Sequence, residues 1–102
     1  MKAAIYARSA IKDDENIVQQ VAQCEKVAQM GNMHIQKIYI DNGVSGNGEK
    51  PQLNKMLSEL NKFDFIIVTK NDKLSRNAEE LYNVKRKLEK NNILIFTFNQ
   101  KE

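Results

Sequence analysis

The sequence predicts an α/β domain with three layers, in which a mostly parallel sheet of four to five strands is flanked by helices on both faces. Two observations lead to this prediction. Short, almost wholly apolar runs alternate along the chain with longer stretches whose apolar residues recur at helical spacing. Glycine, asparagine and proline stand between these runs and mark their ends. Strands that alternate with helices usually pair in parallel, with the helices as crossovers.

Four segments have the pattern of strands. Residues 3–7 are almost entirely apolar, which indicates a strand that is buried on both faces. A second strand carries Ile35, Ile38 and Ile40 and ends at residues 41–43. The third and fourth strands are expected at residues 63–69 and 93–98.

Three segments between these strands have the pattern of helices. The first follows the acidic residues 13–15, which suit the positive end of a helix dipole, and it is expected to end at Gly31 as a C-cap. The second begins at Pro51 and the third carries Leu81 and Leu88 on its apolar face. Residues 43–50 hold three of the four glycines and are expected to form a mobile loop.

Length and composition indicate one domain of a cytoplasmic protein. The 102 residues fit a single core, with 41% apolar and 28% charged residues. No apolar run approaches the ~18 residues that a membrane span needs, and residues 1–8 do not resemble a signal peptide. The single cysteine, Cys24, excludes an internal disulfide and a cysteine cluster for zinc.

The net charge of +3 is only weak evidence for a nucleic-acid partner. Residues 1–49 carry 5 Lys/Arg against 6 Asp/Glu, a net of −1, whereas residues 50–102 carry 11 against 7, a net of +4. A basic second half can face phosphate. The alternative is a set of solvated helix faces, and charge alone favours that alternative.

Polar and basic residues gather where the predicted strands end. In an open parallel sheet, ligands bind beyond the carboxyl ends of the strands. Arg8 and Ser9 follow the first strand, the glycine-rich loop follows the second, and residues 70–77 follow the third. Guanidinium groups bind phosphate through paired hydrogen bonds, and a hydroxyl among them is a candidate nucleophile. The only histidine, His34, starts the second strand, and no carboxylate cluster for Mg²⁺ is present, so the chemistry expected here is arginine-assisted and metal-free.

These segments together resemble the catalytic, N-terminal domain of the serine site-specific recombinases of the resolvase and invertase type. The matching segments, in order and spacing, are Tyr6-Ala7-Arg8, Gln20, residues 41–46, residues 50–53 and residues 72–77. The segment from Phe63 to Asn77 is the most specific of them, and the resemblance covers essentially the whole chain of 102 residues.

The resemblance implies an enzyme of DNA site-specific recombination. In this family a serine attacks a DNA phosphodiester, forms a 5′-phosphoserine bond and leaves a free 3′-hydroxyl, with no cofactor and no metal. Four subunits cut two sites, rotate and rejoin the strands, so the implied partners are DNA and further copies of the protein. The catalytic residues carried over are Ser9, Arg8, Gln20, Asp72 and Arg76. The residues carried over for binding the DNA phosphate are Tyr6, Ser45, Lys50 and Lys73.

The chain departs from the family pattern at three positions around this site. The family has arginine, any residue and then serine, whereas here Arg8 is followed by Ser9 and then Ala10. Because strand side chains alternate between faces, Ser9 faces the expected side only if the strand bulges. Lys50 and Lys73 stand where arginines are usual, and lysine lacks the bidentate fork. The second hypothesis is therefore a degenerate relative that acts in assembly or regulation.

Two further expectations follow from the resemblance. If the arginines act on the phosphate, Arg8→Ala and Arg76→Ala nearly abolish cleavage while the fold survives. The family continues into a long helix and a DNA-binding domain, and residues 1–102 contain neither, so we expect weak DNA binding from this piece.

A third hypothesis sets the resemblance aside and predicts a flavodoxin-like or receiver-like domain. A receiver needs carboxylates after its first strand to hold Mg²⁺, but Arg8 and Ser9 stand there. A dinucleotide fold needs a glycine fingerprint at the same place, and residues 8–14 contain no glycine. Both observations count against this hypothesis.

Overall fold

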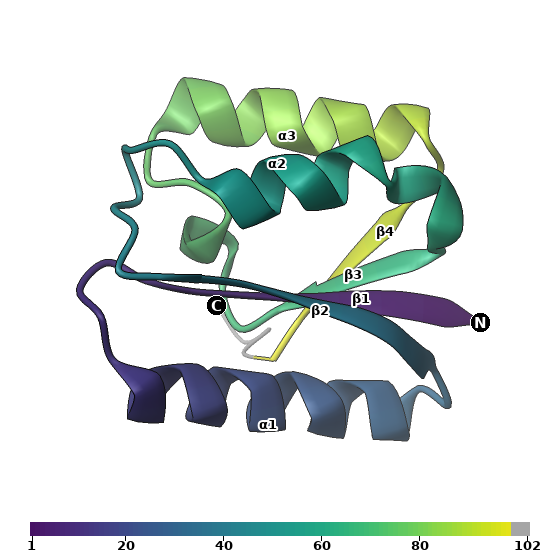
Figure 1. Ribbon diagram of the computed structural model, residues 1–102. Helices are drawn as coiled ribbons and strands as arrows, with labels where there is room; N and C mark the ends of the chain where they lie inside the picture. Colours follow the sequence, from purple (N-terminus) through teal and green to yellow (C-terminus); the bar gives the residue numbers. More distant parts are fainter. Residues whose placement is uncertain (99–102) are drawn as a thin grey trace.

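The computed structural model describes residues 1–98 and has four parallel strands in one sheet, in the order β2-β1-β3-β4. The strands are β1 (Lys2–Ser9), β2 (His34–Asn42), β3 (Phe65–Val68) and β4 (Leu94–Thr97). The helices are α1 (Asp14–Met30), α2 (Pro51–Ser58) and α3 (Ala78–Lys90), with 3₁₀ turns η1 (Leu60–Lys62) and η2 (Asn71–Lys73). Helix α1 covers one face of the sheet, and α2 and α3 cover the other (Figure 1). The predicted three-layer α/β fold is confirmed.

Strand β1 lies in the middle of the core, and its side chains alternate strictly between the two faces. Ala4 and Tyr6 pack in the core on the side of α2 and α3, together with Leu53 of α2. Ala3 and Ile5 pack in the second core, beneath α1. The same alternation places Arg8 on the α2 and α3 side of the sheet and Ser9 on the α1 side.

Strand β2 contains one irregularity, and it lies far from the site. Ala3 of β1 is opposite Ile35, but Ala4 is opposite Lys37, so one extra residue, Gln36, is accommodated in β2. Before the bulge the odd-numbered Ile35 packs beneath α1, whereas after the bulge the odd-numbered Tyr39 belongs to the other core. The bulge therefore explains why the isoleucines of β2 stand at an odd position, 35, and then at even positions, 38 and 40. Beyond the bulge the pairing is regular as far as Ser9 opposite Asn42.

The end of α1 differs from the prediction in one detail. Gly31 is the C-cap, as expected, but its φ is −97° and the left-handed residue is Asn32, with φ of 56°. Asparagine tolerates this conformation better than most residues. Asn92 repeats the arrangement after α3, with φ of 58°.

Cys24 is fully buried on the inner face of α1. Burial, with a smaller effect from the charge of Glu25, raises the pKa of its thiol to about 12. The thiol therefore stays protonated and acts as a small packing residue. None of the helices formed by residues 1–98 is long and apolar enough to cross a membrane.

Candidate functional site

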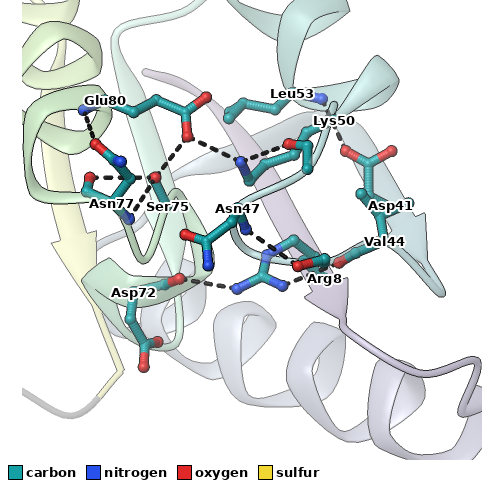
Figure 2. A network of polar contacts seen from close by, with 12 residues as sticks. Arg8, Asp41, Val44, Asn47, Lys50, Leu53, Asp72, Ser75, Asn77 and Glu80 are labelled. Atoms are coloured by element: carbon teal, nitrogen blue, oxygen red, sulfur yellow. Dashed lines mark hydrogen bonds and ion pairs between the residues drawn. The ribbon is translucent and has the colours of Figure 1, made fainter.

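The guanidinium of Arg8 is buried between two loops, and backbone oxygens surround it. The side chain is 2% exposed. Nε donates to the Lys73 carbonyl at 2.9 Å, Nη2 to the Asp72 carbonyl at 2.9 Å and Nη1 to the Val44 carbonyl at 3.0 Å. Figure 2 shows the guanidinium between Val44 and Asp72. Arg8 therefore joins the loop after β2 to the loop after β3.

No carboxylate forms an ion pair with Arg8 within residues 1–98. A buried charge that is solvated only by carbonyl dipoles is not cancelled, so its positive potential extends to the surroundings. Burial is the main cause that lowers the pKa of Lys73 and the charge of Arg8 is the next, whereas Arg8 makes the smallest contribution to the lowered pKa of Glu80.

Gln20 fixes the backbone at the end of β1. Its amide donates to the Arg8 carbonyl at 2.8 Å, and its oxygen accepts from the Arg8 backbone N–H at 3.2 Å. Strand β3 pairs with β1 only from Ala3 to Ile5, so it leaves this part of β1 without a neighbour on that side. The Gln20 side chain supplies the two hydrogen bonds that a longer β3 would make.

Ser9 lies apart from this arrangement. It is 9% exposed, and its hydroxyl donates to the carbonyl of Ile11 at 2.6 Å. Because β1 is regular from Ala4 to Ser9, no bulge at the strand end turns this hydroxyl to the face of Arg8. Ala10, the residue at the position where the family pattern has its serine, is exposed and lies just beyond the end of β1.

A pocket of about 380 Å³ opens between α1 and the loop that follows β3. Its lining consists of Asn16, Gln19, Gln20, Gln23, Thr69, Lys70, Asp72, Lys73, Arg76 and Phe98. Four of the residues expected in the site, Gln20, Asp72, Lys73 and Arg76, thus line one pocket.

Positive charge prevails on the loop side of this pocket. Lys70, Lys73 and Arg76 stand against one carboxylate, Asp72, and the buried Arg8 lies beneath them. Burial is the main cause that lowers the pKa of Lys73, and the charges of Arg8, Arg76 and Lys70 lower it further. Guanidinium and ammonium groups in this arrangement match the charge and hydrogen-bonding needs of an anion.

The glycine-rich loop is held in place by several hydrogen bonds, although its composition predicts a mobile segment. Gly46 accepts from the Arg76 backbone N–H, and Val44 accepts from the Arg8 guanidinium. A Cβ on Gly46 would lie 2.7 Å from Cγ of Arg76 and 3.0 Å from Nη2 of Arg8. Only glycine lets the loop approach both arginines this closely.

Lys50 anchors the far end of the same loop. It is 2% exposed, and Nζ bonds to the Gly48 carbonyl and to Oε1 of Glu80, both at 3.0 Å. Ser75 donates to the same carboxylate at 2.6 Å, so Glu80 joins the loop before α2 to the start of α3 (Figure 2). Because its ammonium is already paired, Lys50 has a structural role here and connects the glycine-rich loop to α3.

The Lys50–Glu80 contact predicts a specific pH dependence of stability. Burial alone would raise the pKa of Glu80, but hydrogen bonds from Ser75 and Lys50 outweigh it and the pKa is lowered. A carboxyl with a lowered folded-state pKa stabilises the fold above its unfolded pKa of about 4.3 and loses that contribution as the pH falls through the folded value. We expect urea unfolding to show a steeper loss of stability below about pH 4.5 in the unaltered chain than in Glu80→Gln.

Glu79→Gln is the matched control for this measurement, because Glu79 is an exposed neighbour whose side chain makes no hydrogen bond to residues 1–98. Its pH profile should follow that of the unaltered chain. Parallel profiles for all three proteins would show that the contact with Lys50 contributes nothing.

Asp41 is a structural residue that the sequence analysis did not place in the site. It is 4% exposed and accepts from Tyr6 Oη at 2.8 Å and from the backbone N–H groups of Gln52 and Leu53 at 3.0 and 3.1 Å. The N-cap position of α2 is Lys50, which offers no side-chain cap, so Asp41 caps this helix from β2. Tyr6 is fully buried, and burial with the hydrogen bond to Asp41 raises its pKa well above the usual range.

Asp41→Ala is expected to lower the free energy of unfolding by about 2 kcal/mol, since two helix N–H groups and a buried tyrosine hydroxyl lose their acceptor. Tyr6→Phe removes one of these three hydrogen bonds and should lower it by about 1 kcal/mol. Urea unfolding followed by circular dichroism measures both. Equal effects of the two substitutions would show that Asp41 does not cap α2.

Apart from Ser9, which lies on the other face of β1, the structure divides the expected site residues into two groups. Around the pocket lie Gln20, Asp72, Lys73 and Arg76, with Arg8 beneath them. Tyr6 and Lys50 are buried and paired with Asp41 and Glu80, while Ser45 is exposed and its Oγ accepts from Asn47 N at 3.2 Å. Within the described part of the chain, no group of three His, Cys, Asp or Glu residues is placed to hold a metal ion. The roles of these residues in catalysis remain predictions.

The fold and the residues at its edge agree with a comparison against protein families. The family model "Resolvase, N terminal domain" matches residues 3–102. The chain belongs to this family. The resemblance expected from the sequence is therefore confirmed. No curated protein matches the chain.

Solved structures of resolvase-family proteins share the fold. The N-terminal catalytic domain of TP901-1 integrase has 30% identity and a TM-score of 0.88, over 98% of this chain and 79% of that one. The C-terminal catalytic domain of ISC1926 TnpA, an IS607-like serine recombinase, has 19% identity and a TM-score of 0.87, over 99% and 72%. A resolvase family site-specific recombinase from Streptococcus pneumoniae has 19% identity and a TM-score of 0.83, over 96% and 72%.

Proposed function

We propose that this resolvase-family domain takes part in site-specific DNA recombination by binding DNA phosphate, and that it acts in assembly or regulation without cutting the strand. One observation carries the proposal. The side chain of Ser9 lies on the face of β1 opposite to Arg8, its hydroxyl donates to the carbonyl of Ile11, and Ala10 stands at the position where the family pattern has serine.

The phosphate-binding part of the proposal rests on the cationic pocket. Among residues 1–98, Lys70, Lys73 and Arg76 border it together with one carboxylate, and no carboxylate pairs with Arg8. Contacts of this kind bind the DNA backbone without regard to sequence and weaken as salt rises.

Strand cleavage through Ser9 is the second candidate, because Arg8, Gln20 and Arg76 match the family pattern in the sequence. In that reaction the Ser9 oxygen attacks phosphorus, the bond to the 3′-oxygen breaks, and the proton from serine ends on the 3′-hydroxyl. The hydroxyl of Ser9 must first leave Ile11 and move to the face of Arg8.

A covalent trapping assay separates the two candidates. This chain replaces the matching part of the catalytic domain in a serine recombinase of known DNA site, and the chimera is incubated with that site. We expect a retained, salt-sensitive complex with DNA and no covalent adduct in mass spectrometry. An adduct that Ser9→Ala abolishes would establish the cleavage mechanism instead, and the intact recombinase serves as the positive control.

A further inference from the structure

One wall of the pocket is a row of amide side chains on a single face of α1. Asn16, Gln19, Gln20 and Gln23 follow one another at helical spacing and all line the pocket. Gln20 is fully engaged with the backbone of Arg8 and with the Asn16 oxygen. The side-chain amides of Gln19 and Gln23 and the side-chain nitrogen of Asn16 make no hydrogen bond to any of residues 1–98, so they are available to a ligand.

The opposite wall has a different chemistry. Lys73 and Arg76 supply positive charge, and Phe98, whose side chain is 42% exposed, adds an aromatic ring to the lining. Side-chain amides without a hydrogen-bond partner in residues 1–98, basic side chains and an exposed aromatic ring thus line one pocket of about 380 Å³. Phosphate alone explains the cations, but it explains neither the amides nor the ring.

We propose that this pocket takes one unpaired nucleotide of a DNA strand, with its phosphate on Lys73 and Arg76 and its base between Phe98 and the amides of Gln19 and Gln23. The inference rests on the proposed function, since it names the part of DNA that the pocket receives. Amides carry both donors and acceptors and match the hydrogen-bonding edge of a base. Aromatic rings stack on bases of any sequence.

The geometry favours an unpaired nucleotide over intact duplex. In a duplex the Watson–Crick edges are occupied and the bases are stacked, so neither the amides nor the ring can reach them. The pocket falls within the range of about 300–1,000 Å³ that is usual for small-ligand sites. A strand whose bases have come apart offers both a phosphate and a free base edge.

The test compares the affinity of the chain for three probes by fluorescence anisotropy: a short single strand, the same strand with abasic sites in place of its bases, and the corresponding duplex. The first two carry the same phosphates and differ only in bases. We expect the single strand to bind about ten-fold more tightly than the abasic strand, which is roughly the worth of one good base contact. Gln23→Ala and Phe98→Leu should each remove most of that preference.

Controls distinguish the base from the phosphate and from a free nucleotide. Gln29→Ala, at an exposed position of α1 outside the pocket, should keep the preference. Arg76→Ala should weaken binding to both single strands alike. Equal binding of the two strands overturns the base pocket but leaves phosphate binding intact, and binding of a deoxymononucleotide as tight as that of the strand assigns the pocket to a free nucleotide. If no probe binds and Arg76→Ala changes nothing, the proposed function fails as well.

Discussion

Arg8→Met is expected to lower the free energy of unfolding by about 3 kcal/mol or more. Methionine fills most of the space of the arginine stem but donates no hydrogen bond. The carbonyls of Val44, Asp72 and Lys73 then lose the donors that now satisfy them. Each buried acceptor left unpaired costs about 1–3 kcal/mol, which is reduced where water reaches it. The loops after β2 and β3 also lose a side chain that bonds to both.

Urea unfolding measures this effect, and Arg76→Met is its control. Arg76 is exposed at the pocket, so its replacement should change stability by less than about 0.5 kcal/mol. The loss of stability in Arg8→Lys should lie between those of Arg8→Met and Arg76→Met, because a lysine ammonium cannot bond to all three carbonyl acceptors. Equal, small losses for Arg8→Met and Arg76→Met would mean that water replaces the guanidinium and that Arg8 has no structural role.

This pair of variants revises the expectation drawn from the resemblance. The resemblance implies that Arg8→Ala and Arg76→Ala both abolish chemistry while the fold survives. The structure separates the two residues, since one is buried with all three guanidinium nitrogens engaged and the other is exposed at the pocket. We therefore expect Arg8 to support the site through loop geometry and through its charge, and the exposed Arg76 to contact a ligand directly.

The elements of the fold were predictable because each carries a strong local pattern. The apolar run of β1 and the spacing of Ile17, Cys24 and Ala28 on α1 identify their elements without any long-range information. Their ends were less certain, and β1 continues to Ser9 instead of ending near Ala7. The extension is held by pairing with β2 and by Gln20, and neither contact is visible in the local sequence.

The candidate site was predictable only in part, because burial and partner choice are decided between distant segments. The sequence places Lys50 and Glu80 30 residues apart, and nothing local indicates that they pair. The capping of α2 by Asp41 could not be predicted from local sequence either, because the capping residue belongs to β2 and not to the residues next to the helix. The effect of the one-residue shift at Ser9, by contrast, followed from strand alternation alone, and the regular pairing at the end of β1 supports it.

Ala10→Ser is expected to convert a chain that forms no covalent DNA adduct into one that does. The substitution puts a hydroxyl at the position that the family pattern assigns to the nucleophile, two residues after Arg8. Ala10 is exposed, so the added oxygen meets no packing constraint and stability should change by less than about 0.5 kcal/mol. The surrounding cations then stabilise charge that develops on the phosphate oxygens.

The same chimera and DNA site used for the trapping assay measure this gain, with mass spectrometry locating the modified serine. Ser9→Ala combined with Ala10→Ser should form the adduct as readily as Ala10→Ser alone, because the Ser9 hydroxyl serves only to bond Ile11 at the strand end. Adding Arg76→Ala to Ala10→Ser should abolish the adduct while DNA is still bound through the other cations. An adduct at Ser9 in the unaltered chain would instead show that the end of β1 rearranges on DNA. If the Ala10→Ser chimera binds its site but forms no adduct, the lysines at positions 50 and 73, in place of the usual arginines, are enough to stop strand cleavage.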